Sequence, residues 1–134
     1  MPSVKEAAAT LAVKDTAATI AVRDAKSSRK FYEGTLGLKL VDDKMPEALV
    51  FKSGSSKVLV YQSQYAGTNK ATAANWGVGE DIENIVQGLK AKGVTFEHYD
   101  MPGLTRKGDV HVGGNMKAAW FKDPDGNILA LVSG

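Results

Sequence analysis

The two histidines of the chain are the side chains best suited to acid–base or metal chemistry near neutral pH. His98 has a carboxylate two positions further on, at Asp100. His111 follows Asp109 at the same spacing, and an extended backbone would place those two side chains on one side. Either histidine could serve as a general base or a metal ligand, and His98, His111 and Asp109 could together form a metal site. The alternative interpretation is that both are solvated side chains without a chemical role.

The aromatic residues suggest a different chemistry, in which a planar organic molecule is held by stacking and apolar burial. Most of them fall in or near expected strands, where they could line a cavity. The alternative is that they fill the core or a dimer interface, and this applies most strongly to Trp120. The predicted ligand-binding residues are Trp76, Tyr61, Phe51, Trp120, Tyr99, Met101 and His111.

Composition limits the classes of function. The chain has 134 residues, of which 43% are hydrophobic and 24% charged, as in one ordinary globular domain. A net charge of +2 argues against binding to nucleic acid or to an anionic membrane. The absence of cysteine excludes disulfides, zinc–thiolate sites and thiol catalysis. No apolar run approaches the ~20 residues that a membrane span needs, and the first residues make a poor signal peptide, so we expect a cytoplasmic protein.

Hydrophobic periodicity predicts a first module over residues 16–63 and a second over 74–133, separated by a linker at 64–73. Residues 1–15 are predicted to be a weakly ordered leader or an edge strand. In the first module we expect strands at 17–22, 38–41, 48–52 and 57–62, with a helix over 25–36 that Asp24 caps and Gly37 ends. In the second we expect strands at 75–78, 94–99, 116–122 and 127–132, a helix capped by Asp81 and ended by Gly93, and a long loop at 101–115. The sequence at 123–126 predicts a type I turn.

These elements give an α+β fold of two βαβββ modules. Neither module has enough strands to bury its own apolar face, so we expect one shared, cupped, mostly antiparallel sheet with the helices outside. The concave face of such a sheet is where we expect a ligand.

Four segments make the chain resemble the vicinal oxygen chelate superfamily, also called the glyoxalase/bleomycin-resistance/extradiol-dioxygenase fold. They are TIAVRD at 19–24, RKFY through LGL at 29–38, KAKGV at 90–94 and AWFKDPDGN at 119–127. Each motif alone is weak, but all four occur in order and at matching spacing. The resemblance also implies a homodimer, and it extends to small, mostly uncharacterised bacterial members.

Metal-dependent members of that family take His, Glu or Gln ligands from the first and last strands of each half. By this resemblance, the equivalent positions are Ala17, Ala74 and Ala130, and the fourth ligand would fall at Val58 or Val60. A divalent cation needs oxygen or nitrogen donors, which these side chains lack. We therefore predict that the usual metal site is absent and that no cofactor is required.

The sequence thus favours a member that binds a small hydrophobic or aromatic molecule in a cupped pocket without a metal, as the family's antibiotic-sequestering members do. Two alternatives stay open. One is an enzyme of the lyase, isomerase or dioxygenase kind with a relocated metal or a metal-free acid–base site. The other is a protein-interaction module that uses the leader.

Overall fold

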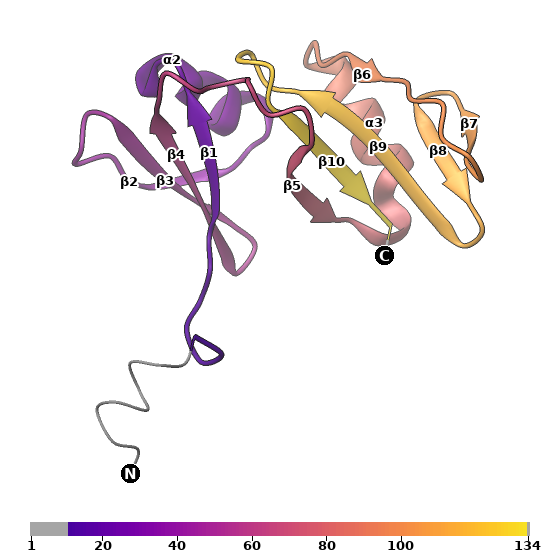
Figure 1. The fold of residues 1–134 in the computed structure, drawn as a ribbon, viewed down its shortest axis with the longest axis horizontal. Coiled ribbons are helices and arrows are strands. Elements are labelled where there is room, and N and C mark those ends of the chain that lie inside the picture. The colour runs from indigo at the N-terminus through magenta and orange to yellow at the C-terminus, as the bar shows by residue number, and fades with distance from the viewer. Residues whose placement is uncertain (1–10, 134) are drawn as a thin grey trace.

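The computed structural model describes residues 11–133, in which two modules lie side by side (Figure 1). The first module consists of β1 (Ala18–Val22), α2 (Ala25–Arg29), the π-helix η1 (Lys30–Thr35), β2 (Lys39–Asp42), β3 (Ala48–Ser53) and β4 (Ser56–Gln62). The second consists of β5 (Thr72–Gly77), the 3-10 helix η2 (Gly79–Asp81), α3 (Ile82–Ala91), β6 (Phe96–Glu97), β7 (Thr105–Lys107), β8 (Val110–Gly113), β9 (Met116–Lys122) and β10 (Ile128–Val132). Within the described part, no helix is long and apolar enough to span a membrane. Most of the predicted leader, residues 1–10, lies outside it.

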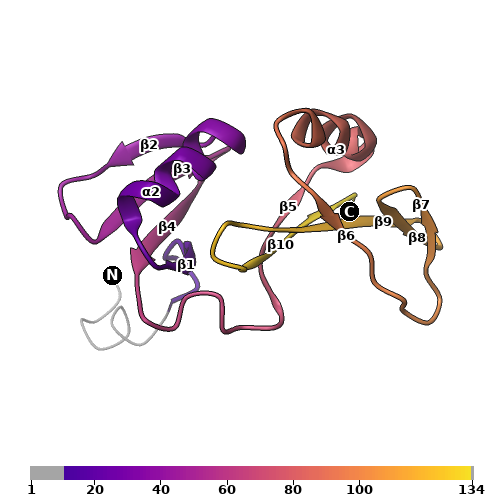
Figure 2. The same ribbon diagram turned by 90° about the horizontal axis from the view of Figure 1, so that it is seen from above.

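Each module contributes one sheet, and the predicted α+β class is confirmed. The 4-stranded sheet has the order β1-β4-β3-β2, and the 6-stranded sheet has the order β5-β10-β9-β8-β7, with β6 also paired to β9. The pairs β1–β4 and β5–β10 are parallel and the others are antiparallel. β1 and β5 are the edges at which the sheets meet. The helices of both modules lie on one side of the sheets, which we call the helix side (Figure 1, Figure 2).

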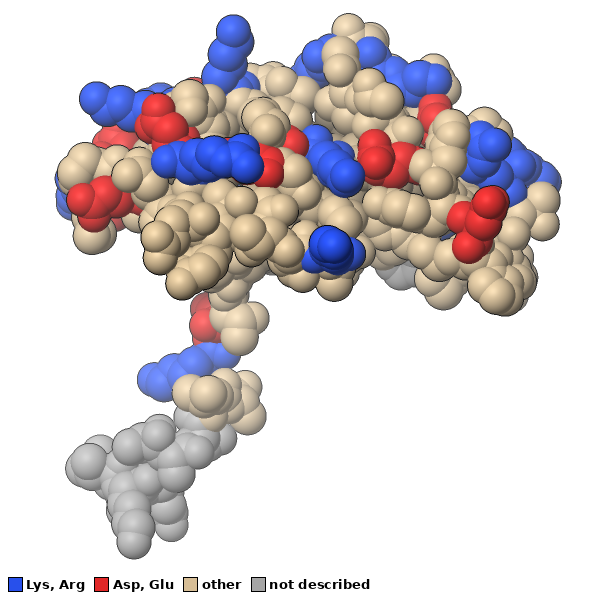
Figure 3. Space-filling model, turned by 45° about the horizontal axis from the view of Figure 1, so that its top comes forward, with Lys and Arg blue, Asp and Glu red and all other residues tan. Residues whose placement is uncertain are grey.

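Alternation along the strands separates a buried face from an open one. In the first sheet, Ile20, Phe51 and Val60 are fully buried on the helix side. In the second sheet, Phe121 and Leu129 are fully buried against α3. The opposite faces, which we call the open faces, carry the intervening residues because side chains alternate along a strand. Acidic and basic side chains are interleaved on the upper part of the surface in Figure 3, and fewer of them lie along the lower edge of the body, above the projecting N-terminal segment.

The two helices differ from the sequence prediction in how they begin and continue. Asp24 does cap the first helix, because its carboxylate accepts a hydrogen bond from Lys26 N at 3.1 Å. This helix then widens into η1, in which Leu36 N donates to Phe31 O five residues earlier. Asp81 makes no side-chain capping bond and instead ends the 3-10 helix η2.

The loop predicted at 101–115 contains the hairpin β7–β8. The cause is the shortness of β6, which pairs only with Trp120 and Phe121 of β9. The beginning of β9 is left without a partner on that edge, and β8 pairs there with residues 116–118. Likewise, β5 begins at Thr72, so the linker is two residues shorter than predicted.

The predicted turn at 123–126 joins the modules. Asp123, almost completely buried, accepts hydrogen bonds from the Tyr32 hydroxyl at 2.6 Å and the Asn127 side-chain amide at 2.8 Å. Its other oxygen accepts from the backbone N–H groups of Asp125 and Asn127, which shapes the turn. Asn127 also donates to Ala21 O in β1, at 2.8 Å. The turn between β9 and β10 is therefore bonded to the first module.

Tyr32 should make stability fall at alkaline pH. Burial, together with the negative charge of Asp123, raises the pKa of the Tyr32 phenol well above its usual range. The unfolded chain releases this proton near pH 10 while the folded chain keeps it, so the stabilisation is present below pH ~10 and is lost as pH rises. We expect the wild type to lose up to about 1.4 kcal/mol per pH unit more than Tyr32→Phe above pH ~10. Urea unfolding of both proteins between pH 9 and about 11 measures this, and parallel stability curves would contradict it.

Candidate functional site

The open face of the second sheet holds three of the seven predicted ligand-binding residues, at one end of β9 and β8. Trp120 in β9 lies opposite Ala130 in β10, and Ala130 lies opposite Asn75 in β5. These three residues alternate with buried positions such as Phe121 and Leu129, so they lie on the face away from α3. Trp120 is half-buried, and its indole N–H donates to Thr72 Oγ1 at 3.3 Å.

Tyr99, His111 and Trp120 form a group that we call the aromatic cluster. The His111 and Trp120 rings are 4.9 Å apart and nearly perpendicular, at 81°. The Tyr99 and Trp120 rings are 5.4 Å apart at 77°, while Tyr99 and His111 are tilted by 30° at 6.3 Å. Edge-to-face contacts of this kind hold each ring in a fixed orientation. Three of the predicted ligand-binding residues are therefore brought together.

His111 is only 1% exposed and has one unpaired nitrogen. Its Nε2 accepts a hydrogen bond from the backbone N–H of Tyr99 at 3.0 Å. This bond assigns the proton of the neutral ring to Nδ1, since Nε2 must offer a lone pair. Nδ1 has no hydrogen-bond partner among residues 11–133. An unpaired buried donor costs roughly 1–3 kcal/mol. Nδ1 exposes almost no surface, so an added acceptor would reach it only after neighbouring side chains move.

The segment 99–104 covers part of this open face. His111 and Gly113 of β8 lie on the same face, and the Leu104 side chain packs directly on the Gly113 backbone. A side chain at Gly113 would overlap the end of the Leu104 side chain and lie tightly against the carbonyl oxygen of Gly103, so glycine favours this close approach of the segment. Leu104 and Gly113 were not singled out from the sequence. The adjacent glycines Gly113 and Gly114 could have indicated this contact, because glycine permits a close approach of another segment.

The positions at which the family's metal ligands would be expected do not fit a metal. Ala17 precedes β1 and is exposed, and Ala130 offers only a methyl group on the open face. Ala74 corresponds to no open-face position, because it pairs with the buried Leu129 and packs on the helix-side core. The physical reason is the 3-10 helix η2, which lies between β5 and α3. Counting back from Asp81 in the same way as from Asp24 therefore arrives one position away from the open face. Among the described residues, no three His, Cys, Asp or Glu side chains gather as a metal site.

The fourth position also needs correction. Val58 and Val60 both face the helix side, where they are buried opposite Phe51 and Leu49. Leu59 and Tyr61 occupy the open face of β4 instead, and Tyr61 is 39% exposed. Neither supplies a ligand that a divalent cation would prefer.

His98 is held in a separate polar group. Its Nε2 lies 2.7 Å from Asp109 Oδ1, and its Nδ1 lies 3.1 Å from Arg106 Nη1. Asp109 also accepts from Lys90 at 2.8 Å, and the hydrogen bonds from Lys90 and then His98 lower the pKa of its carboxyl group. Both ring nitrogens of His98 are thus engaged, and His111 uses Nε2 for Tyr99. His98, His111 and Asp109 therefore do not assemble a metal site.

The remaining predicted residues lie apart from the aromatic cluster. Phe51 is fully buried beside Tyr32, with ring centroids 6.0 Å apart. Met101 is 39% exposed in the segment before β7. Trp76 packs on the helix side, two residues after Ala74, and donates its indole N–H to Ser53 Oγ at 2.8 Å.

A family model described as Glyoxalase/Bleomycin resistance protein/Dioxygenase superfamily matches residues 15–131. The chain is similar to the glyoxalase family protein from Enterococcus faecalis, with a TM-score of 0.69, 20% identity, and coverage of 92% of this chain and 99% of that one. It is similar to the fosfomycin resistance protein FosX from Listeria monocytogenes, with a TM-score of 0.67, 14% identity, and coverage of 89% and 91%. It is also similar to lactoylglutathione lyase from Agrobacterium tumefaciens, with a TM-score of 0.64, 16% identity, and coverage of 92% and 94%. No curated protein sequence matches the chain.

Proposed function

The chain belongs to the glyoxalase/bleomycin resistance protein/dioxygenase superfamily, and on that premise we propose that it binds a small planar aromatic molecule at the aromatic cluster without a metal. The observation that carries the proposal is the buried His111 ring with its unpaired Nδ1–H, set between Tyr99 and Trp120. Affinity comes from stacking and apolar burial, and selectivity comes from one hydrogen bond.

Trp120 supplies the stacking surface. It is half-buried, and its N–H is already paired with Thr72, so the ring offers its apolar body rather than a polar group. Its neighbours on the open face are small: Ala118 lies two residues earlier in β9, and Ala130 lies directly opposite in β10. Both alanines are largely buried, and their methyl groups continue the apolar surface beside the indole.

His111 supplies the selectivity. Because the backbone N–H of Tyr99 occupies Nε2, the ring acts as a donor through Nδ1 only. A ligand with an aromatic nitrogen or a carbonyl oxygen would accept this hydrogen bond. The same arrangement argues against His111 as a general base, since its lone pair is already used. Binding is therefore better supported than metal-free acid–base catalysis.

The test uses quinoline and naphthalene, which have the same shape and differ in a single acceptor nitrogen. Trp76→Phe leaves Trp120 as the one tryptophan, and its fluorescence is followed during titration at pH 8 with EDTA present. Quinoline should bind about fivefold more tightly than naphthalene, which is the effect of one net hydrogen bond of about 1 kcal/mol. Removing divalent metals should change neither affinity.

The matched control is His111→Phe in the same background, which keeps a ring but removes the donor. It should bind both compounds equally, with a circular dichroism spectrum that reports the native fold. Equal affinities in the parent, or binding that appears only when metal is added, would rule out the proposal.

We also propose that the chain acts as a homodimer. Two exposed apolar side chains support this, because a second subunit could bury them. Val41 on β2 is 48% exposed, and Tyr61 on the open face of β4 is 39% exposed. Sedimentation equilibrium checks the assembly. The cytoplasmic location expected from the sequence stays a prediction.

A further inference from the structure

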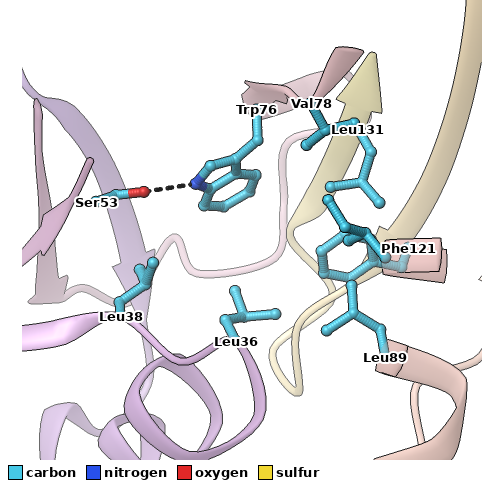
Figure 4. Close-up of a pocket in the computed structure, with 9 residues that line it drawn as sticks. Leu36, Leu38, Ser53, Trp76, Val78, Leu89, Phe121 and Leu131 are labelled. Atoms are coloured by element: carbon cyan, nitrogen blue, oxygen red, sulfur yellow. Dashed lines mark hydrogen bonds between the residues drawn. The ribbon is translucent and has the colours of Figure 1, made fainter. Parts of the chain in front are cut away.

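A cavity lies on the helix side, facing away from the aromatic cluster. It occupies about 200 Å³ between the two modules. Leu36 and Leu38, which follow η1, line it from the first module, and Leu89 of α3 and Phe121 of β9 line it from the second (Figure 4). Each module packs its own sheet against its own helix, and the space between these two cores is left unfilled.

Trp76 forms a wall of this cavity. Its indole ring lies between Ser53 and Leu131, and the N–H donates to Ser53 Oγ across the gap between the modules (Figure 4). The hydrogen bond satisfies the one polar atom of the indole, so the ring presents an apolar surface to the cavity. The sequence prediction had assigned Trp76 to the concave face; the structure gives it a different cavity.

The chemistry of the lining selects an apolar occupant. None of the described residues that line the cavity is charged, and apart from the paired Ser53 and Trp76 groups the side chains are aliphatic or aromatic hydrocarbon. Water needs two or more polar partners, so water inside this cavity is poorly held and an apolar molecule displaces it easily. A cavity of about 150 Å³ with similar walls can take up benzene.

We propose that this cavity is a binding site for one single-ring apolar molecule of the size of benzene or toluene. Leu36, Trp76 and Leu89 are half-buried, so the cavity reaches the surface and a ligand can enter between them. Filling the space restores the dispersion contacts that the walls now lack. This proposal does not depend on ligand binding at the aromatic cluster, which lies on the other side of the sheet.

The test is a toluene titration of Trp120→Phe, in which Trp76 is the one remaining tryptophan. Trp76 emission should change with a single saturable phase and a Kd on the order of 0.1–1 mM. Saturating toluene should also raise the Tm by a few degrees, because it binds the folded state.

Two variants fill the cavity from different sides. Leu89→Phe places a larger side chain from α3, and Val78→Phe does so from the segment after β5. Each should weaken toluene binding at least about tenfold while the Tm stays the same or rises. Met45→Phe, at a residue 62% exposed and away from the cavity, should leave binding unchanged. A Trp76 signal that does not saturate, or toluene binding that survives in a folded Leu89→Phe or Val78→Phe variant, would overturn the proposal.

Discussion

Replacing Asp123 by alanine is expected to lower the free energy of unfolding by about 4 kcal/mol. The carboxylate of the almost completely buried Asp123 accepts four hydrogen bonds, including those from the Tyr32 hydroxyl and the Asn127 amide. Alanine would leave these donors buried and unpaired, and each costs roughly 1–3 kcal/mol. Urea unfolding at pH 7, followed by circular dichroism, measures the change.

Two companion variants make this result specific. Asp42→Ala removes an exposed aspartate that accepts one hydrogen bond, from Lys44 N, and should cost less than about 1 kcal/mol. Tyr32→Phe removes one donor from the junction, so a double-mutant cycle with Asp123→Ala isolates that bond. If Asp123→Ala destabilised the protein no more than Asp42→Ala, the junction would not have the importance we assign to it.

Replacing Gly67 by alanine is expected to cost about 3 kcal/mol, for two separate reasons. Gly67 has a φ of +71°, which disfavours any side chain. A methyl group there would also overlap the carbonyl oxygen of Asp125 in the 123–127 turn. Because that oxygen belongs to the backbone, relief requires movement of either the linker or the turn.

Gly54→Ala is the matched control for this change. Gly54 has a similar φ of +58°, but a methyl group there would have nothing within 4 Å. It should therefore show the conformational cost alone, about 1 kcal/mol. Thermal unfolding of both variants measures the difference, and equal losses of stability would show that the contact between Gly67 and Asp125 is unimportant.

Local patterns were enough to predict most of the fold. Alternation in 116–122 and 127–132 placed β9 and β10 almost to the residue, because one face of each strand is buried. Asp24 and Gly37 marked the ends of the first helical segment through capping and a positive φ. In both cases, the physical cause acts between residues close in sequence.

Features of the site that depend on long-range contacts were not predictable in the same way. Ala74 and Trp76 were assigned to the concave face by counting from Asp81, and the 3-10 helix η2 changed that count by one residue. In a strand, a shift of one position moves a side chain to the opposite face. The burial of His111 likewise depends on Tyr99, twelve residues earlier, whose backbone binds the ring.

Side chains alternate between the two faces of the β9–β10 hairpin, so the two faces are under different evolutionary constraints. Phe121 and Leu129 belong to the core beneath α3, and substitutions there are felt throughout the fold. Trp120 and Ala130, their immediate neighbours, face away from that core. Trp120 is half-buried, so substitutions there should disturb the core less than those at Phe121, whereas Ala130 is only 3% exposed and leaves little room for a larger side chain. A single hairpin can thus diversify in specificity along one face while its other face is conserved for stability.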